Sequence, residues 1–270
     1  MKRLKLKTSG GGAFLSTLLC LESSFKTFVS GQAARLGFTL AEVLLTLGII
    51  GVVCALTLPS LIANHKEKET VTRLKKAYST LSNAYTGVLN EYGPPPDWNV
   101  ESWDDVVVMF SKYIQNVRVC TLMQGGCFFS EARKDLRNNK VDQMASMSSL
   151  VMSDGIVMGI GHQIGVEQAL PCENLNYCFQ FEVDINGDKR PNRWGEDTFT
   201  FVVTKDKVIP RGGKDTHGRQ KMCDPSASST SAGWYNGSGC AAWVIQSENL
   251  DYLKCVKGNQ KYCNKDYYFN

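Results

Sequence analysis

The chain has 270 residues and a formal net charge of +4, and hydrophobic residues make up 43% of it. Six of its 30 basic residues lie in the first 37 positions, where Glu22 is the one acid. The rest of the chain carries 24 basic and 25 acidic side chains. The positive net charge therefore belongs to the N-terminal segment and gives no support for a nucleic-acid-binding face.

An uncharged segment of 21 residues runs from Val43 to Ala63. A helix of this length and composition is able to cross a bilayer. Glu42 directly precedes the segment, at a point where an ionised carboxylate is costly in hydrocarbon. The cost indicates that the acid has a functional reason to be there. The basic side chains upstream favour a cytoplasmic N terminus.

The residues Gly37-Phe38-Thr39-Leu40-Ala41-Glu42 resemble the processing site of type IV prepilins and of the pseudopilins of type II secretion. In that family a prepilin peptidase cuts after the glycine and methylates the new terminal amine. The resemblance implies that residues 1–37 are a leader peptide and that the mature chain begins with N-methyl-Phe38. Pro59 also falls where many members of the family carry a helix-kinking proline.

The resemblance also implies that Glu42 acts in assembly. A new amine at Phe38 is a cation, and two opposite charges in apolar surroundings are tolerated when they are paired and hydrogen-bonded. Residues four apart on a helix are neighbours, so Glu42 can meet the amine of its own chain. The family implies instead the amine of an adjacent subunit. The sequence does not decide between the amine of the same chain and the amine of an adjacent subunit.

The helical pattern continues beyond the uncharged segment. From Val71 to Tyr92, apolar and aromatic residues recur at steps of three and four, with charged residues between them. We therefore expect one helix from about Thr39 to Tyr92, with 38–63 as its transmembrane or filament-core half. Gly93 and three prolines then end it.

Shorter elements are expected in the extracytoplasmic head, 64–270. A helix is predicted over 102–115, and strand-like runs follow at 149–160, 179–185, 197–204 and 207–210. Asp154-Gly155 predicts a hairpin turn in the first run. The segment 211–240 is predicted as a loop and Ala241–Ile245 as a last strand. This order indicates a pilin-like α+β fold, in which the long helix packs on an antiparallel sheet beside a disulfide-rich C-terminal region.

The ten cysteines indicate the compartment of the head. Cys20 lies in the leader and Cys54 in the uncharged segment, so an even set of eight remains. Such a set beyond a membrane anchor is typical of disulfides in an oxidising compartment. Eight cysteines allow 105 connectivities. We favour the local pairs Cys120–Cys127, Cys172–Cys178, Cys223–Cys240 and Cys255–Cys263 over zinc sites, because none has the close spacing of structural zinc ligands.

One segment has the composition of a metal site. Asp184, Asn186 and Asp188 place oxygen atoms at alternate positions, as at the start of a calcium loop, and Asp197 is a further candidate ligand. The fourth residue is Gly187, whereas an EF-hand needs glycine at the sixth. Asn186-Gly187 is also a strong hairpin signal. Some major pseudopilins hold calcium near the end of the sheet, but calcium and a plain hairpin both stay open here.

Motifs for catalysis are weak in this sequence. It has three histidines, no nucleophile elbow and no phosphate-binding glycine loop, so we do not expect an enzyme. The resemblance implies a structural subunit of a type IV pilus or a type II secretion pseudopilus. Such a subunit starts as a single-pass inner-membrane protein and then enters an extracellular or periplasmic filament.

The resemblance also implies the partners of the chain. These are the prepilin peptidase, other pilin or pseudopilin subunits and membrane lipid. The alternative function is a membrane-anchored extracytoplasmic binding or adhesion module that does not polymerise.

Overall fold

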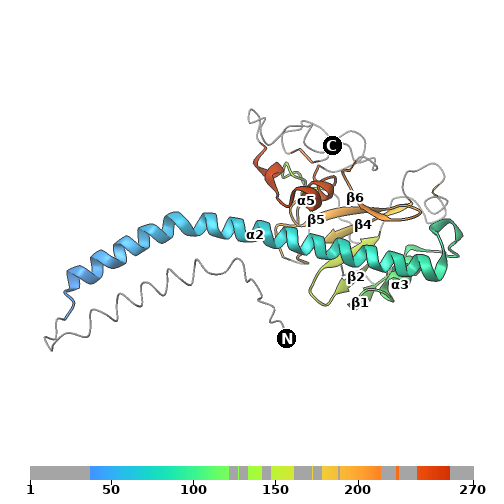
Figure 1. The fold of residues 1–270 in the computed structure, drawn as a ribbon, viewed down its shortest axis with the longest axis horizontal. Helices are drawn as coiled ribbons and strands as arrows, with labels where there is room; N and C mark the ends of the chain where they lie inside the picture. Colours follow the sequence, from blue (N-terminus) through green and yellow to red (C-terminus); the bar gives the residue numbers. More distant parts are fainter. Residues whose placement is uncertain are drawn as a thin grey trace, which may run out of the picture. The chain divides into compact units, whose positions relative to one another are not determined.

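The computed structural model describes residues 37–121, 127, 133–141, 147–160, 172, 178–187, 189–213, 223–224 and 236–255. Within these residues the chain forms one long helix, a six-stranded antiparallel sheet and short helices (Figure 1). The fold is therefore α+β, as the sequence predicts. The chain divides into two compact units, Met1–Leu58 and Pro59–Asn270.

The long helix α2 spans Leu40–Tyr92 and confirms the predicted helix. In the first unit every large apolar side chain from Leu40 to Leu58 is exposed. Pro59 lies inside the helix, which continues through it as one element. Gly93 follows with a φ of 75°, a left-handed conformation that favours glycine and ends the helix.

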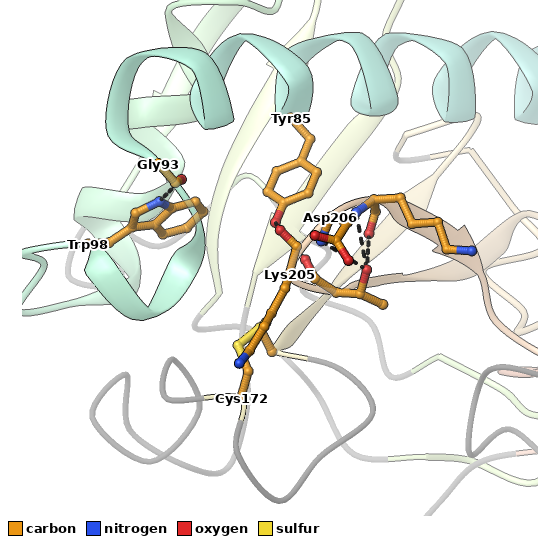
Figure 2. The surroundings of a disulfide bond; sticks show 9 residues. Tyr85, Gly93, Trp98, Cys172, Lys205 and Asp206 are labelled. Atoms are coloured by element: carbon orange, nitrogen blue, oxygen red, sulfur yellow. Dashed lines mark hydrogen bonds between the residues drawn. A yellow bond between two sulfur atoms is a disulfide. The ribbon is translucent and has the colours of Figure 1, made fainter.

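In the second unit α2 lies across the sheet (Figure 1). Its buried residues recur at steps of three and four: Val71, Leu74, Ala77, Leu81, Ala84, Tyr85 and Val88. Tyr78 stacks on Phe201, with ring centroids 5.4 Å apart. The Tyr85 hydroxyl points away from the helix and donates to the carbonyl oxygen of Lys205 at 3.1 Å (Figure 2). These contacts fasten the amphipathic half of α2 to the sheet.

The sheet has the strand order β1-β2-β3-β4-β5-β6, and all neighbours are antiparallel. In that order the strands span Asn116–Cys120, Ser148–Met152, Val157–Ile160, Phe179–Asp184, Thr198–Val203 and Val208–Pro210. The predicted hairpin is confirmed as β2 and β3, with Gly155 at a φ of 83° in its turn. The three later runs are confirmed as β4, β5 and β6. Strand β1 is an addition to the prediction.

The helix α3, Trp103–Ser111, covers the apolar face of the sheet together with α2. Its start carries a capping box, in which Ser102 and Asp105 bond each other's backbone N–H groups. The predicted helix over 102–115 is confirmed but ends four residues earlier. Phe110 packs edge-to-face on Phe181, with ring centroids 4.8 Å apart. Aromatic side chains thus fill the core between α3 and β4.

The opposite face of the sheet is polar and also buried. Gln180, Glu182 and Asp184 of β4 alternate with the core residues and are almost fully inaccessible. Glu182 forms an ion pair with buried Arg133 at 2.8 Å. Gln180 accepts a hydrogen bond from Arg211 at 2.8 Å. Segments outside the sheet therefore cover this face and supply its polar partners.

The prediction of a strand over Ala241–Ile245 is wrong, because this segment forms the helix α5, Ala241–Ser247. Its first four residues are buried without alternation, and the two alanines at its start favour a helix. Short 3₁₀ helices lie at Pro95–Asp97 (η1) and Asp251–Lys254 (η3). In the predicted loop 211–240, the described residues form no helix or strand.

Three predicted disulfides are confirmed: Cys120–Cys127, Cys172–Cys178 (Figure 2) and Cys223–Cys240. Cys255 is also disulfide-bonded, while its predicted partner Cys263 lies outside the described residues. The third bridge joins Cys223 to Cys240, which is the last residue of the predicted loop and directly precedes α5. Disulfides therefore fasten the C-terminal region, as the sequence predicts.

Candidate functional site

The predicted processing junction lies in the segment 37–39, directly before α2. Phe38 is 74% exposed. A Cβ atom added at Gly37 meets nothing within 4 Å, and the backbone of Gly37 is not in the left-handed region. Neither packing nor backbone conformation requires glycine at this position. A requirement for Gly37 would therefore have to come from a molecule that recognises the segment.

Thr39 and Glu42 form a reciprocal cap at the start of α2. The backbone N–H and the hydroxyl of Thr39 both donate to Oε2 of Glu42, each at 2.9 Å. The backbone N–H of Glu42 donates to the Thr39 hydroxyl oxygen at 3.2 Å. This arrangement is a capping box, which satisfies N–H groups that a helix start leaves unpaired. It also holds the carboxylate at the positive end of the helix dipole.

Thr39 is thus a third partner for Glu42, besides the amine of its own chain and the amine of an adjacent subunit. The spacing Thr39-x-x-Glu42 is itself the sequence signal of a capping box, so the contact was predictable. Oε1 of Glu42 has no hydrogen bond to any described residue. Because each carboxylate oxygen is an acceptor, the capped side chain can still receive an ammonium group.

The helix α2 is also the membrane candidate. It is the one helix among the described residues that is long and apolar enough to cross a membrane, and its most apolar window has no buried residue. A bare apolar surface of this length is unfavourable in water. The first half of α2 therefore needs lipid or other apolar helices around it.

Three of the four predicted calcium ligands come together between β4 and β5, while Asp188 lies outside the described residues. The side-chain amide of Asn186 donates to Asp197 at 3.3 Å. The Thr198 hydroxyl oxygen lies 3.1 Å from an oxygen of Asp184 and 3.4 Å from an oxygen of Asp197. The two carboxylates thus flank a single hydroxyl group. They are 0% and 2% exposed, respectively.

Each carboxylate also closes a turn of the chain. Asp184 accepts two backbone N–H groups from the turn that follows it, at 3.0 and 2.7 Å. Asp197 accepts those of Asn192 and Arg193 at 2.7 and 2.6 Å. The strands β4 and β5 are joined through residues 185–197, so Asn186-Gly187 is not a two-residue hairpin turn. The longer connection brings Asp197 back to Asp184.

Burial makes the ionised forms of both acids unfavourable. It raises the pKa of Asp184 to about 8, and the charge of Asp197 adds to this rise. Burial also raises the pKa of Asp197 to about 6, against the hydrogen bonds from the N–H groups of Arg193 and Asn192. Both shifts would be reversed by a cation bound between the carboxylates.

The remaining oxygen atoms fit a hard cation. The side-chain oxygens of Asn186 and Asn192 are buried and have no hydrogen-bond partner among the described residues, and Asn192 is 5% exposed. Calcium takes carboxylate and amide oxygens as ligands. The described residues hold no group of three or more His, Cys, Asp or Glu side chains suited to a metal. A calcium ion would therefore need the amide oxygens.

A protein-family comparison matches much of the head. The model described as "Family of unknown function (DUF6613)" matches residues 60–225, which is more than half of the chain. The chain belongs to this family. The match in DUF6613 covers the amphipathic half of α2 and the whole sheet, and it begins after the Gly37–Glu42 junction. Comparison with curated proteins and with solved structures gives no match.

Proposed function

We propose that the chain is a structural subunit of a type IV pilus or a type II secretion pseudopilus. In this proposal a prepilin peptidase cuts after Gly37 and methylates Phe38. The apolar half of α2 first anchors the subunit in the inner membrane and then packs against the same helix of other subunits. The disulfide-bonded head faces outward.

The proposal rests on the position of the junction relative to the two halves of α2. The junction Gly37–Glu42 stands at the start of a helix whose first half is bare and apolar and whose second half packs on a sheet. Such a helix can pass from lipid into a bundle of like helices, because both surroundings cover its apolar side chains. Glu42 then supplies the polar contact that fixes one helix against the next, since a buried charge needs a partner.

Replacement of Glu42 by alanine tests polymerisation. The Glu42→Ala chain should be cleaved and stay in the membrane fraction, but be lost from filaments sheared off the cells. Glu69→Ala is the matched control, because Glu69 is an exposed acid on the same helix beyond the uncharged segment. If the Glu42→Ala chain enters filaments as efficiently as the wild type, the proposal fails.

A membrane-anchored binding or adhesion module remains the alternative. It uses the same anchor but needs no contact between helices. Under this alternative neither Glu42→Ala nor Glu69→Ala changes localisation, and the wild-type chain is absent from sheared filaments. Fractionation of cells that express the three chains separates the two functions.

A structural calcium ion is a second proposal, carried by the unpartnered, buried side-chain oxygen of Asn192 beside the two acids. We propose that Asp184, Asn186, Asp188 and Asp197 hold the ion, with the side-chain oxygen of Asn192 as a further ligand. Its charge would neutralise the buried carboxylates and tie the end of β4 to the connection that leads into β5. The role is structural, because nothing in the donor set calls for a reaction.

A further inference from the structure

A cavity of about 530 Å³ lies beside α2 in the second compact unit. Its walls are the helix segment from Ala63 to Arg73, the connection 185–197 and the residues 250–254 around η3. Sites for small molecules have volumes of about 300–1,000 Å³. The cavity is therefore large enough for a polar group of ligand size.

We propose that this cavity binds the phosphate headgroup of an anionic phospholipid from the membrane that α2 spans. The inference rests on the membrane anchor of the proposed function. Ala63, the last residue of the uncharged segment, lines the cavity, and Lys66 follows about 4.5 Å further along the helix. With the uncharged segment in hydrocarbon, Ala63 and Lys66 lie within three residues of its end and therefore near the lipid phosphates.

Basic side chains line the cavity from three elements. Lys66 and Arg73 belong to α2, Lys189 and Arg190 to the connection between β4 and β5, and Lys254 to η3. Arg73 is held in place by the carbonyl oxygens of residues 185 and 154, at 2.6 and 2.9 Å. Lys66 and Lys189 are exposed and form no ion pair with any described residue. These two lysines are thus available to an anion.

Four acids also line the cavity: Glu67, Glu69, Glu196 and Asp197. Glu67 accepts the backbone N–H of Leu250 at 2.8 Å. Glu196 pairs with Arg193 at 2.9 Å, and Glu69 lies 3.7 Å from Arg73. Asp197 accepts two backbone N–H groups. Each of these acids is thus bound to a group other than Lys66 or Lys189, so neither lysine is held by an acid of the cavity.

Apolar side chains favour a lipid over a free anion. Ile185, Pro191, Leu250 and Leu253 line the cavity beside the basic residues. A phospholipid presents a phosphate close to the start of its apolar acyl chains, and the cavity offers both kinds of contact. Lysine side chains at the end of a membrane helix extend toward the headgroups, and anionic lipid surfaces attract them.

The test uses the full chain in nanodiscs of phosphatidylcholine, with or without added phosphatidylglycerol. Lysines are acylated with a water-soluble reagent and quantified peptide by peptide by mass spectrometry. Phosphatidylglycerol should slow the acylation of Lys66 and Lys189 several-fold. Lys68 is the internal control, because it is exposed on the same helix at similar depth but does not line the cavity. Equal protection of Lys68 would mean general surface attraction and would overturn the proposal.

Matched variants make the test specific. Lys66→Gln/Lys189→Gln should lower the share of phosphatidylglycerol that stays bound when nanodiscs are dissolved in detergent, whereas Lys68→Gln should leave it unchanged. Inorganic phosphate is added to phosphatidylcholine nanodiscs as a separate arm. Protection of both lysines by phosphate alone would assign the cavity to a soluble anion, and protection that grows with protein concentration would assign it to a second copy. Either outcome overturns the lipid proposal.

Failure of the anchor is distinguishable from failure of the site. A chain that does not enter phosphatidylcholine nanodiscs contradicts the membrane anchor itself. A chain that enters them, but shows the same lysine acylation in both lipid mixtures, contradicts only the headgroup site.

Discussion

Oε2 of Glu42 lies 2.9 Å from both the backbone nitrogen and the hydroxyl oxygen of Thr39. The carboxylate that we propose for assembly is therefore also part of the capping box that starts α2, with Thr39 as the N-cap residue. A cap of this kind stabilises the start of the helix, because it satisfies backbone N–H groups that have no partner inside the helix. It also orients the carboxylate before a second subunit arrives.

Replacing Thr39 with valine should lower filament yield without abolishing it. The change removes one of the two hydrogen bonds to Oε2 and the acceptor for the Glu42 N–H, but it keeps the shape of the side chain. Thr39→Ser keeps the hydroxyl group and should restore the yield. The measurement is the subunit content of sheared filaments, with cleavage monitored in parallel. Equal yields from Thr39→Val and wild type would show that the cap is unimportant for assembly.

Removing the bridge Cys223–Cys240 should destabilise the head by about 3 kcal/mol, the value that the chain-entropy model gives for a loop of about 15 residues. The two cysteines are 17 positions apart. Denaturant unfolding of the detergent-solubilised Cys223→Ser/Cys240→Ser chain measures the loss. Cys54→Ser is the control, because Cys54 is a free, exposed cysteine in α2. An unchanged unfolding midpoint in the double variant would contradict a stabilising role.

The free energy of unfolding of the calcium-free protein should fall as the pH rises. The pKa of Asp184 is about 8 in the folded protein, compared with an ordinary value of 3.8. The folded state thus binds this proton more tightly than the unfolded state does. The resulting stabilisation is complete below about pH 4 and is lost progressively up to about pH 8.

Unfolding curves between pH 5 and about 8 measure this dependence. Asp184→Asn carries no titrating group at this position and should give a flatter profile than the wild type. A wild-type stability that rises over the same range would contradict the raised pKa.

Calcium should raise the melting temperature of the chain at neutral pH, because a ligand that binds only the folded state stabilises it by mass action. Asp184→Asn and Asp197→Asn should each abolish the calcium-induced shift. Asp206→Asn is the control, since Asp206 is an exposed acid in the turn between β5 and β6. If calcium does not raise the melting temperature of the wild-type protein, the calcium proposal fails. Asp184 and Asp197 then serve only to close their turns.

Long periodic segments of this fold were predictable from the sequence. The steps of three and four residues over Val71–Tyr92 gave the amphipathic half of α2. The strand-like runs, of which 179–185 alternates, gave β2 to β6. Strand β1 was missed because five residues after a helical pattern carry little periodicity. Ala241–Ile245 was assigned to the wrong class because a short apolar run has no distinctive period.

The candidate sites were predictable only where their residues are close in the sequence. The motif from Gly37 to Glu42 and the acids near Asp184 could be recognised from local patterns. That Lys66 and Lys189 line the same cavity depends on how α2 packs against the end of the sheet, which no local pattern encodes. Asn192 was missed for a similar reason, because its burial is set by the connection between β4 and β5 and not by spacing.

The N-terminal residue of the membrane-bound chain decides whether it is processed as a filament subunit. Mass spectrometry of the N-terminal peptide, from cells that contain the prepilin peptidase, identifies this residue. We expect N-methylated Phe38 as the first residue, with the segment 1–37 removed. A chain that retains its sequence upstream of Phe38 in those cells would contradict processing, and with it the proposed role in a filament.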